Sequence, residues 1–197
     1  MRSSKMNGYI GDFSSSFLSC EKDMESIIRK LFVDSKPYSD ELKRLIVINT
    51  DDCLLDKTNP KYIEKIKSMS VDKLMKEGYV RLVPKIARGE NQEEQTYIVI
   101  SFNDFTPNET NPYFRDCTVM IDILCHPDNW YLNNYQLRPI KIAGYIDAIL
   151  NGERFSGIGT FQFIGCNELI LQEDLSGYCL IYRAVHGIDD VIPVEDE

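Results

Sequence analysis

The clearest pattern of hydrophobic and polar positions runs from Asp116 to Leu150. Between residues 117 and 125 apolar side chains alternate, which is the two-residue period of a β-strand. The sequence His126-Pro127-Asp128-Asn129 ends this pattern, because proline cannot donate a hydrogen bond to a neighbouring strand. From about Pro139 to Leu150 the apolar residues recur at helical spacing. The residues on this apolar face are Ile142, Ile146, Ile149 and Leu150. We therefore predict a strand, an ordered loop, and a helix packed on the sheet that contains the strand.

Apolar positions before residue 79 also recur at helical spacing, with Ser, Asn and Pro at the expected starts. The apolar run from Leu45 to Ile48 has no period, and it is compatible with either a helix or a strand. The predicted helices are Cys20 to Val33, Asp40 to about Ile46, Asn59 to about Met69, and a short one after Ser70 that ends at Lys76.

Most of the remaining chain consists of short β-like runs separated by turn residues. The predicted strands are Tyr79 to Ala87, Gln95 to Phe102, Asp116 to Cys125, Thr160 to Gly165, Glu168 to Gln172 and Gly177 to Val185. Arg88 to Glu94 is predicted to be a hairpin tip, Asn103 to Asn111 a loop, and Phe155 to Gly159 a link. Short turns favour antiparallel neighbours. The predicted fold class is α+β, a mostly antiparallel twisted sheet with the helices 21–33 and 139–150 on one face.

The chain of 197 residues is expected to form one α+β domain over residues 20–186, with a helical excursion at 56–78. An extended N-terminal arm (1–19) and an acidic C-terminal tail (187–197) flank it. Neither a signal peptide nor a membrane span is expected, because the apolar runs are too short. The arm carries four large apolar residues, Tyr9, Ile10, Phe13 and Phe17. They are compatible with a disordered terminus or with an arm that becomes ordered on a neighbouring subunit.

The net charge of −9 argues against tight, sequence-independent DNA binding, because the longest basic cluster is Lys43-Arg44. An acidic surface past which DNA slides is still compatible with this charge. The six cysteines form no C-x-x-C pair and are expected to be reduced core thiols. Cys125 and His126 lack the partners at zinc-site spacing, so neither a metal nor a cofactor is expected.

Catalytic motifs are scarce, and we do not expect an enzyme. His126 and His186 lie at predicted strand ends without a nucleophile motif nearby. Asp104, Asp116 and Asp122 lie on or near strands and offer the oxygen ligands that a metal-dependent nuclease would need. A nuclease or other DNA-processing enzyme therefore remains an alternative. A second alternative is an intracellular adaptor that binds a host protein.

Aromatic residues gather in the loop after the central strand, at Trp130, Tyr131 and Tyr135. Such side chains give a large contact area at low entropic cost, which is typical of interfaces. A loop folded on its own core would have the same composition. We predict that this loop, the arm from Tyr9 to Phe17, and the tip that begins at Arg88 make contacts between subunits or between layers of an assembly.

The order of motifs YIVISFNDFTPNETNPYFRD, VMIDILCHPDNW, LRPIKIAGYIDAIL, GIGTFQF and GYCLIYRAVHG resembles the neck proteins of tailed bacteriophages. These are head–tail connector and tail-terminator ring subunits, and the likeness is closest to those of crAss-like phages. The resemblance covers Leu42 to Gly187. It implies a structural virion protein, assembled in the host cytoplasm, that forms a homo-oligomeric ring. Its implied partners are copies of itself, the portal, neck and tail proteins, and double-stranded DNA that passes without specific binding. The family offers no catalytic residues.

Overall fold

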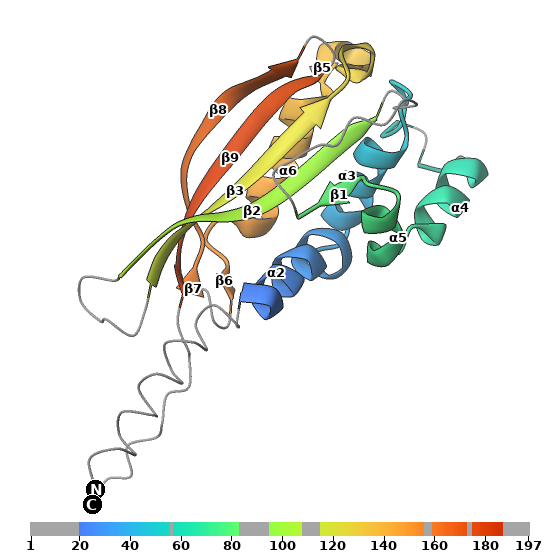
Figure 1. Ribbon diagram of the computed structural model, residues 1–197. Helices are drawn as coiled ribbons and strands as arrows, with labels where there is room; N and C mark the ends of the chain where they lie inside the picture. Colours follow the sequence, from blue (N-terminus) through green and yellow to red (C-terminus); the bar gives the residue numbers. More distant parts are fainter. Residues whose placement is uncertain are drawn as a thin grey trace, which may run out of the picture.

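The computed structural model describes residues 20–55, 57–82, 95–107, 115–155, 159–172 and 175–186. A twisted sheet forms one layer, and the helices lie on one side of it (Figure 1). The helical elements are α2 (Cys20–Arg29), a π-helical turn η1 (Lys30–Asp34), α3 (Tyr38–Val47), α4 (Pro60–Ser68), α5 (Val71–Lys76), the 3₁₀ turns η2 (Pro127–Asn129) and η3 (Asn133–Tyr135), and α6 (Arg138–Leu150). The strands are β1 (Val80–Arg81), β2 (Thr96–Pro107), β3 (Arg115–Cys125), β4 (Tyr131–Leu132), β5 (Gln136–Leu137), β6 (Arg154–Phe155), β7 (Gly159–Thr160), β8 (Gln162–Gln172) and β9 (Leu175–His186). The α+β class is confirmed.

The main sheet has the order β1-β2-β3-β9-β8, and β3 lies at its centre. Ile121 of β3 is opposite Ile100 on one side and Leu180 on the other. The odd-numbered residues of β3 face the helices and are fully buried, namely Val119, Ile121, Ile123 and Cys125. The predicted central strand is therefore confirmed. Gly177 of β9 is required here, because a Cβ atom at this position would lie 1.8 Å from the carbonyl oxygen of Ile123.

Helix α6 covers the centre of the sheet, and in Figure 1 it lies behind β3 and β9. Its predicted apolar face is confirmed, because Ile142, Ile146, Ile149 and Leu150 are all buried. A hydrogen bond from the hydroxyl of Tyr182 to Asp147 Oδ1 (3.1 Å) joins β9 to the same helix. The expected packing of an amphipathic helix on the sheet is therefore present.

The N-terminal helices match their predicted ranges within a few residues. The undecided run from Leu45 to Ile48 is helical up to Val47, and Ile48 is the C-cap of α3. The side chains of Asn59 and Ser70 cap α4 and α5, as their sequence positions suggest. Within the described residues, no helix is long and apolar enough to cross a membrane.

Buried Arg138 explains how this helical run is fixed to α6. Its Nη1 atom donates hydrogen bonds to the carbonyl oxygens of Leu45 (2.6 Å) and Ile48 (2.9 Å), and its Nη2 atom to that of Thr50 (2.7 Å). Its Nε atom donates to the carbonyl oxygen of Asn129 (2.7 Å). The last carbonyl groups of a helix have no partner inside it and favour a cation. The guanidinium therefore closes the end of α3 and ties it to the start of α6.

Four predictions about the strands and their connections differ from the structure. The expected hairpin of residues 79–87 and 95–102 is contradicted in its described part, because Val80 and Arg81 of β1 run parallel to β2. Its predicted tip, 88–94, lies outside the described residues. The expected loop at 103–111 begins later, since β2 continues through a bulge between Asn103 and Thr106 to Pro107. The two short strands expected around Cys166 are one strand, β8, with a bulge between Phe163 and Gly165. The expected link at 155–159 pairs Phe155 of β6 with Gly159 of β7.

Candidate assembly surfaces

The predicted contact residues divide into two groups. Tyr9, Ile10, Phe13, Phe17 and Arg88 lie outside the residues that the structure describes, so their roles remain predictions. Trp130, Tyr131 and Tyr135 lie in the connector from η2 to β5. A hydrogen bond from the backbone N–H of Asn133 to the carbonyl oxygen of Asp51 (3.0 Å) fixes this connector to the turn after α3.

The side chains of the three aromatic residues point in different directions. The indole of Trp130 is half-buried against the core, where its Nε1 donates to the carbonyl oxygen of Cys125 (3.3 Å) and its ring lies 6.3 Å from that of Tyr178. Tyr131 is 70% exposed and Tyr135 is fully exposed. Trp130 therefore caps its own sheet, whereas the two tyrosines offer contact area to solvent.

Tyr135 is held outward by strained backbone. Its φ angle is 60°, and that of Asn134 is 63°, so both residues are in the left-handed region. An aromatic residue in this conformation costs free energy relative to glycine. The strand pair β4–β5 brackets the turn by pairing Tyr131 with Leu137. The left-handed backbone at Tyr135 lowers the stability of the fold, and the ring that it presents is exposed to solvent. Strained backbone beside an exposed aromatic ring is typical of a recognition site.

A wider apolar surface surrounds Tyr135, and we call it the tyrosine face. It is a groove of about 540 Å³ on the outward side of α6. Its principal residues are Tyr38, Tyr135, Ile140, Gly144, Tyr145 and Ala148. Ile140 is 47% exposed, and a Cβ atom on Gly144 would have no neighbour within 4 Å. The small residues at 144 and 148 leave room for another element to approach the helix closely.

Polar contacts hold one wall of the tyrosine face in place. The rings of Tyr38 and Tyr145 lie 5.8 Å apart, and the hydroxyl of Tyr145 is hydrogen-bonded to Glu41 of α3. Burial raises the pKa of Tyr145, and the Glu41 carboxylate raises it further. Burial by itself would raise the pKa of Glu41, but hydrogen bonds from Lys57 and Tyr145 outweigh it and lower the pKa. The wall is therefore a neutral phenol bonded to an ionised carboxylate.

Strand β8 forms a second apolar surface, the β8 edge. It pairs with β9 on one side, and within the described residues no strand pairs with its other side. Its exposed apolar side chains are Phe163 (39%), Ile164 (53%) and Ile170 (71%). Proteins normally protect a long edge strand with charges, proline or a covering element, because its unpaired backbone groups recruit other strands. An eleven-residue edge with exposed isoleucines is consistent with a contact surface.

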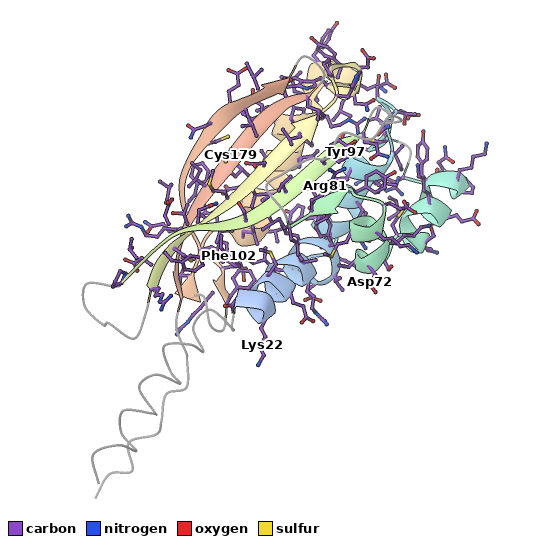
Figure 2. All side chains as sticks on the ribbon, in the orientation of Figure 1. Lys22, Asp72, Arg81, Tyr97, Phe102 and Cys179 are labelled. Atoms are coloured by element: carbon purple, nitrogen blue, oxygen red, sulfur yellow. The ribbon has the colours of Figure 1, made fainter. Side chains whose placement is uncertain are left out.

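The three carboxylates considered for a metal nuclease do not converge. Asp104 is exposed at the bulge of β2 with a φ of 54°. Asp116 and Asp122 lie on the same face of β3 but six residues apart, which is ~20 Å along a strand. Asp122 lies between Val99 and Cys179, the latter labelled in Figure 2, on the face turned away from the helices. Across the described residues, no group of three or more His, Cys, Asp or Glu side chains is arranged to hold a metal ion.

The cysteine and histidine considered for zinc have other roles. Cys125 is fully buried, and burial raises the pKa of its thiol to about 12. The neutral thiol is therefore the stable form at physiological pH, as expected for a core residue. His126 is the N-cap of η2, where its Nδ1 accepts a hydrogen bond from the backbone N–H of Asp128 (3.3 Å).

A family comparison agrees with this architecture. The family model named YomW matches residues 39–184, from α3 to β9, and includes every strand of the main sheet. This chain belongs to the YomW family. The family name derives from a Bacillus phage, so the protein is phage-related. No curated protein matches the sequence. The motif order of Leu42 to Gly187 predicts a phage protein, and the family match over residues 39–184 confirms the relation to phages.

Several residues of the two surfaces were not identified from the sequence. Tyr38 and Tyr145 come from helices far apart in the sequence, so no local motif joins them. Ile140 carried a usable signal, because it falls outside the apolar face of α6 that contains Ile142 and Ile146. The sequence does not indicate that Ile170 of β8 is exposed at an edge, because a strand of mixed composition does not show which side lacks a partner strand.

Proposed function

We propose that this YomW-family protein is a structural virion subunit that assembles with copies of itself into a ring in the phage neck. The ring would join the portal and head to the tail around the channel through which DNA passes. The observation that supports this most is the presence of two unlike apolar surfaces on one subunit, the tyrosine face and the β8 edge. A closed ring is built from heterologous contacts, each of which needs two different complementary surfaces.

The chemistry of the two surfaces fits contacts between proteins. Tyrosine and isoleucine side chains at Tyr135 and Ile140 supply buried area when a partner covers them. The net charge of −9 fits a channel wall that repels DNA phosphates rather than holding them. The phage-related family gives a context in which both properties are used.

The direct test is the oligomeric state of the purified full-length protein. We expect light scattering to give a mass several times that of the 22.8 kDa subunit, and negative-stain images to show rings with a central hole. Ile140→Glu on the tyrosine face and Ile170→Glu on the β8 edge should each reduce the ring population strongly, because each places a charge in a desolvated contact. Lys61→Gln, on the exposed side of α4, changes the net charge by the same amount outside these surfaces and is the matched control.

Two outcomes would overturn this proposal. A protein that stays monomeric at concentrations near 100 μM, with no effect of either substitution, would favour an adaptor. Plasmid cleavage with magnesium or manganese that Asp122→Ala abolishes would favour a nuclease. If Ile140→Glu and Ile170→Glu leave the rings intact, the tyrosine face and the β8 edge are not the contacts that build them.

A further inference from the structure

A third apolar surface lies away from the tyrosine face and the β8 edge, between the N-terminal helices and the sheet. It is a groove of about 680 Å³ whose walls come from α2, α5 and the far part of β2. Its apolar lining includes Met24, Ile28, Val71, Met75, Leu82 and Phe102. Figure 2 labels Phe102 on β2 and Asp72 on α5, two of its lining residues.

The composition of this groove suits a helical ligand with large apolar side chains. Methionines such as Met24 and Met75 adapt their shape to aromatic groups and make favourable sulfur–aromatic contacts. Glu25, Arg29 and Asp72 border it, so its rim has a small excess of negative charge. An amphipathic helix in a hydrophobic groove is a common mode of recognition.

The first 19 residues of the chain contain a segment with matching chemistry. Phe13 follows Ile10 by three residues and Tyr9 by four, and Phe17 follows Phe13 by four, which places these side chains on one face of a helix. As a helix, this stripe is ~12 Å long, and the groove follows α2 and η1 from Met24 to Val33, a rise of ~13 Å. Two basic residues, Arg2 and Lys5, precede the stripe and complement the acidic rim.

The position of α2 argues that the segment comes from another copy. Helix α2 begins at Cys20, so a direct antiparallel return of the same chain would leave Phe17 level with Cys20. Phe13 and Tyr9 would then lie level with Met24 and Ile28, and the half of the groove beside Arg29 and Val33 would stay uncovered. A segment donated by a neighbouring copy has no such restriction.

We propose that the groove between α2, α5 and β2 binds the Tyr9–Phe17 segment of a neighbouring copy. This inference rests on the proposed homo-oligomer. The α2 wall and the donated segment both precede residue 39, where the YomW family match begins. The arm contact therefore supplements a ring contact made by the matched part of the chain.

The test uses the full-length protein with Phe13 replaced by the photoreactive residue benzoyl-phenylalanine. Benzophenones react readily with methionine side chains, and the groove supplies Met24 and Met75. Equal amounts of ordinary and ¹⁵N-labelled protein are assembled together, irradiated, and digested for mass spectrometry. We expect cross-links from position 13 to the peptides that contain Met24 or Met75, with about half of them joining one labelled and one unlabelled chain.

Two groove variants give the matched control. Met75→Glu should lower the cross-link yield to the Met24 peptide about tenfold, because it places an unpaired charge in the contact. Met75→Leu keeps the apolar volume and should retain that yield. Met75 is 37% exposed, so the carboxylate of Met75→Glu can reach solvent in the isolated subunit.

The outcomes separate this inference from the proposed function. Rings that form without cross-links to the groove peptides would overturn the arm contact and leave the proposed ring in place. Cross-links found only within single chains would also overturn it, since the segment would then fold onto its own subunit. A protein that is monomeric by light scattering would overturn both.

Discussion

The two faces of helix α6 carry similar side chains for different purposes. On the inward face Ile142, Ile146 and Ile149 are buried against the sheet. On the outward face Ile140 is 47% exposed beside Gly144 and the tyrosine rings. Burying an isoleucine contributes roughly 1.5–3 kcal/mol to folding. The inward face therefore stabilises the folded subunit. The outward face would contribute a similar free energy of burial only if a partner covered it.

This comparison makes a general prediction about substitutions on one helix. Changes to the inward face should lower the free energy of unfolding, and changes to the outward face should lower the stability of the assembly. The most severe test is Ile146→Asp, which places an unpaired carboxylate among fully buried residues and costs several kcal/mol. We expect an unfolded or aggregated protein, with loss of the cooperative transition in denaturant titration followed by circular dichroism.

The control for Ile146→Asp is Ile140→Asp, the same chemical change on the opposite face of the helix. Its unfolding midpoint in denaturant should stay close to that of the wild type. Equal destabilisation by the two changes would show that the two faces of α6 do not differ in role.

A second prediction concerns the anchor of the inward face. Arg138→Met keeps much of the side-chain volume but removes the donors for the carbonyl oxygens of Leu45, Ile48 and Thr50. Each buried acceptor left without a partner costs about 1–3 kcal/mol. We expect a loss of about 3 kcal/mol or more in the free energy of unfolding, measured by urea titration. Lys141→Met, a change of a partly exposed cation on the same helix, should cost less than about 0.5 kcal/mol.

The inward face and the central strand were predictable because their periods are unambiguous. Alternation in β3 and helical spacing in α6 each report burial on one side only. The run from Leu45 to Ile48 was not predictable, because it is apolar at every position. Its conformation is settled by Arg138, about ninety residues later, which binds the carbonyl groups at the end of α3.

The incorrect strand predictions share a physical cause, because the partner of each strand is set by contacts with residues that are distant in the sequence. The β1–β2 hairpin was inferred from proximity in the chain, whereas Val80 pairs in parallel with Ile98. The break expected at Cys166 followed from polar residues that an edge strand tolerates, because one of its sides is open to solvent. The tyrosine face was only partly predictable, since Tyr135 is local to its loop while Tyr38 and Tyr145 meet through the fold.

A third prediction separates stability from assembly at one residue of the outward surface. Tyr135→Gly removes an exposed ring and relaxes a backbone with a φ of 60°. The free energy of unfolding should stay the same or rise by up to about 1 kcal/mol. Ring formation should weaken by roughly tenfold or more, as expected for a contact residue of this type. Sedimentation velocity over a range of concentrations measures the second effect, and denaturant titration the first.

The smallest expected effect lies at the wall of the tyrosine face, where Glu41 of α3 binds Lys57 and the hydroxyl of Tyr145. The pKa of Glu41 is lowered in the folded protein, so the folded state favours the ionised form more than the unfolded state does. This contribution is present above the unfolded pKa of about 4.5 and is lost as the pH falls through the lower, folded pKa. Glu41→Gln should therefore cost less than about 1 kcal/mol at pH 7, because one partner, Lys57, is largely exposed. The difference between variant and wild type in urea titrations should shrink as the pH is lowered from 5 to 3. A constant difference across that range would mean that Glu41 acts through packing rather than charge, and the outward surface would then have no electrostatic support from α3.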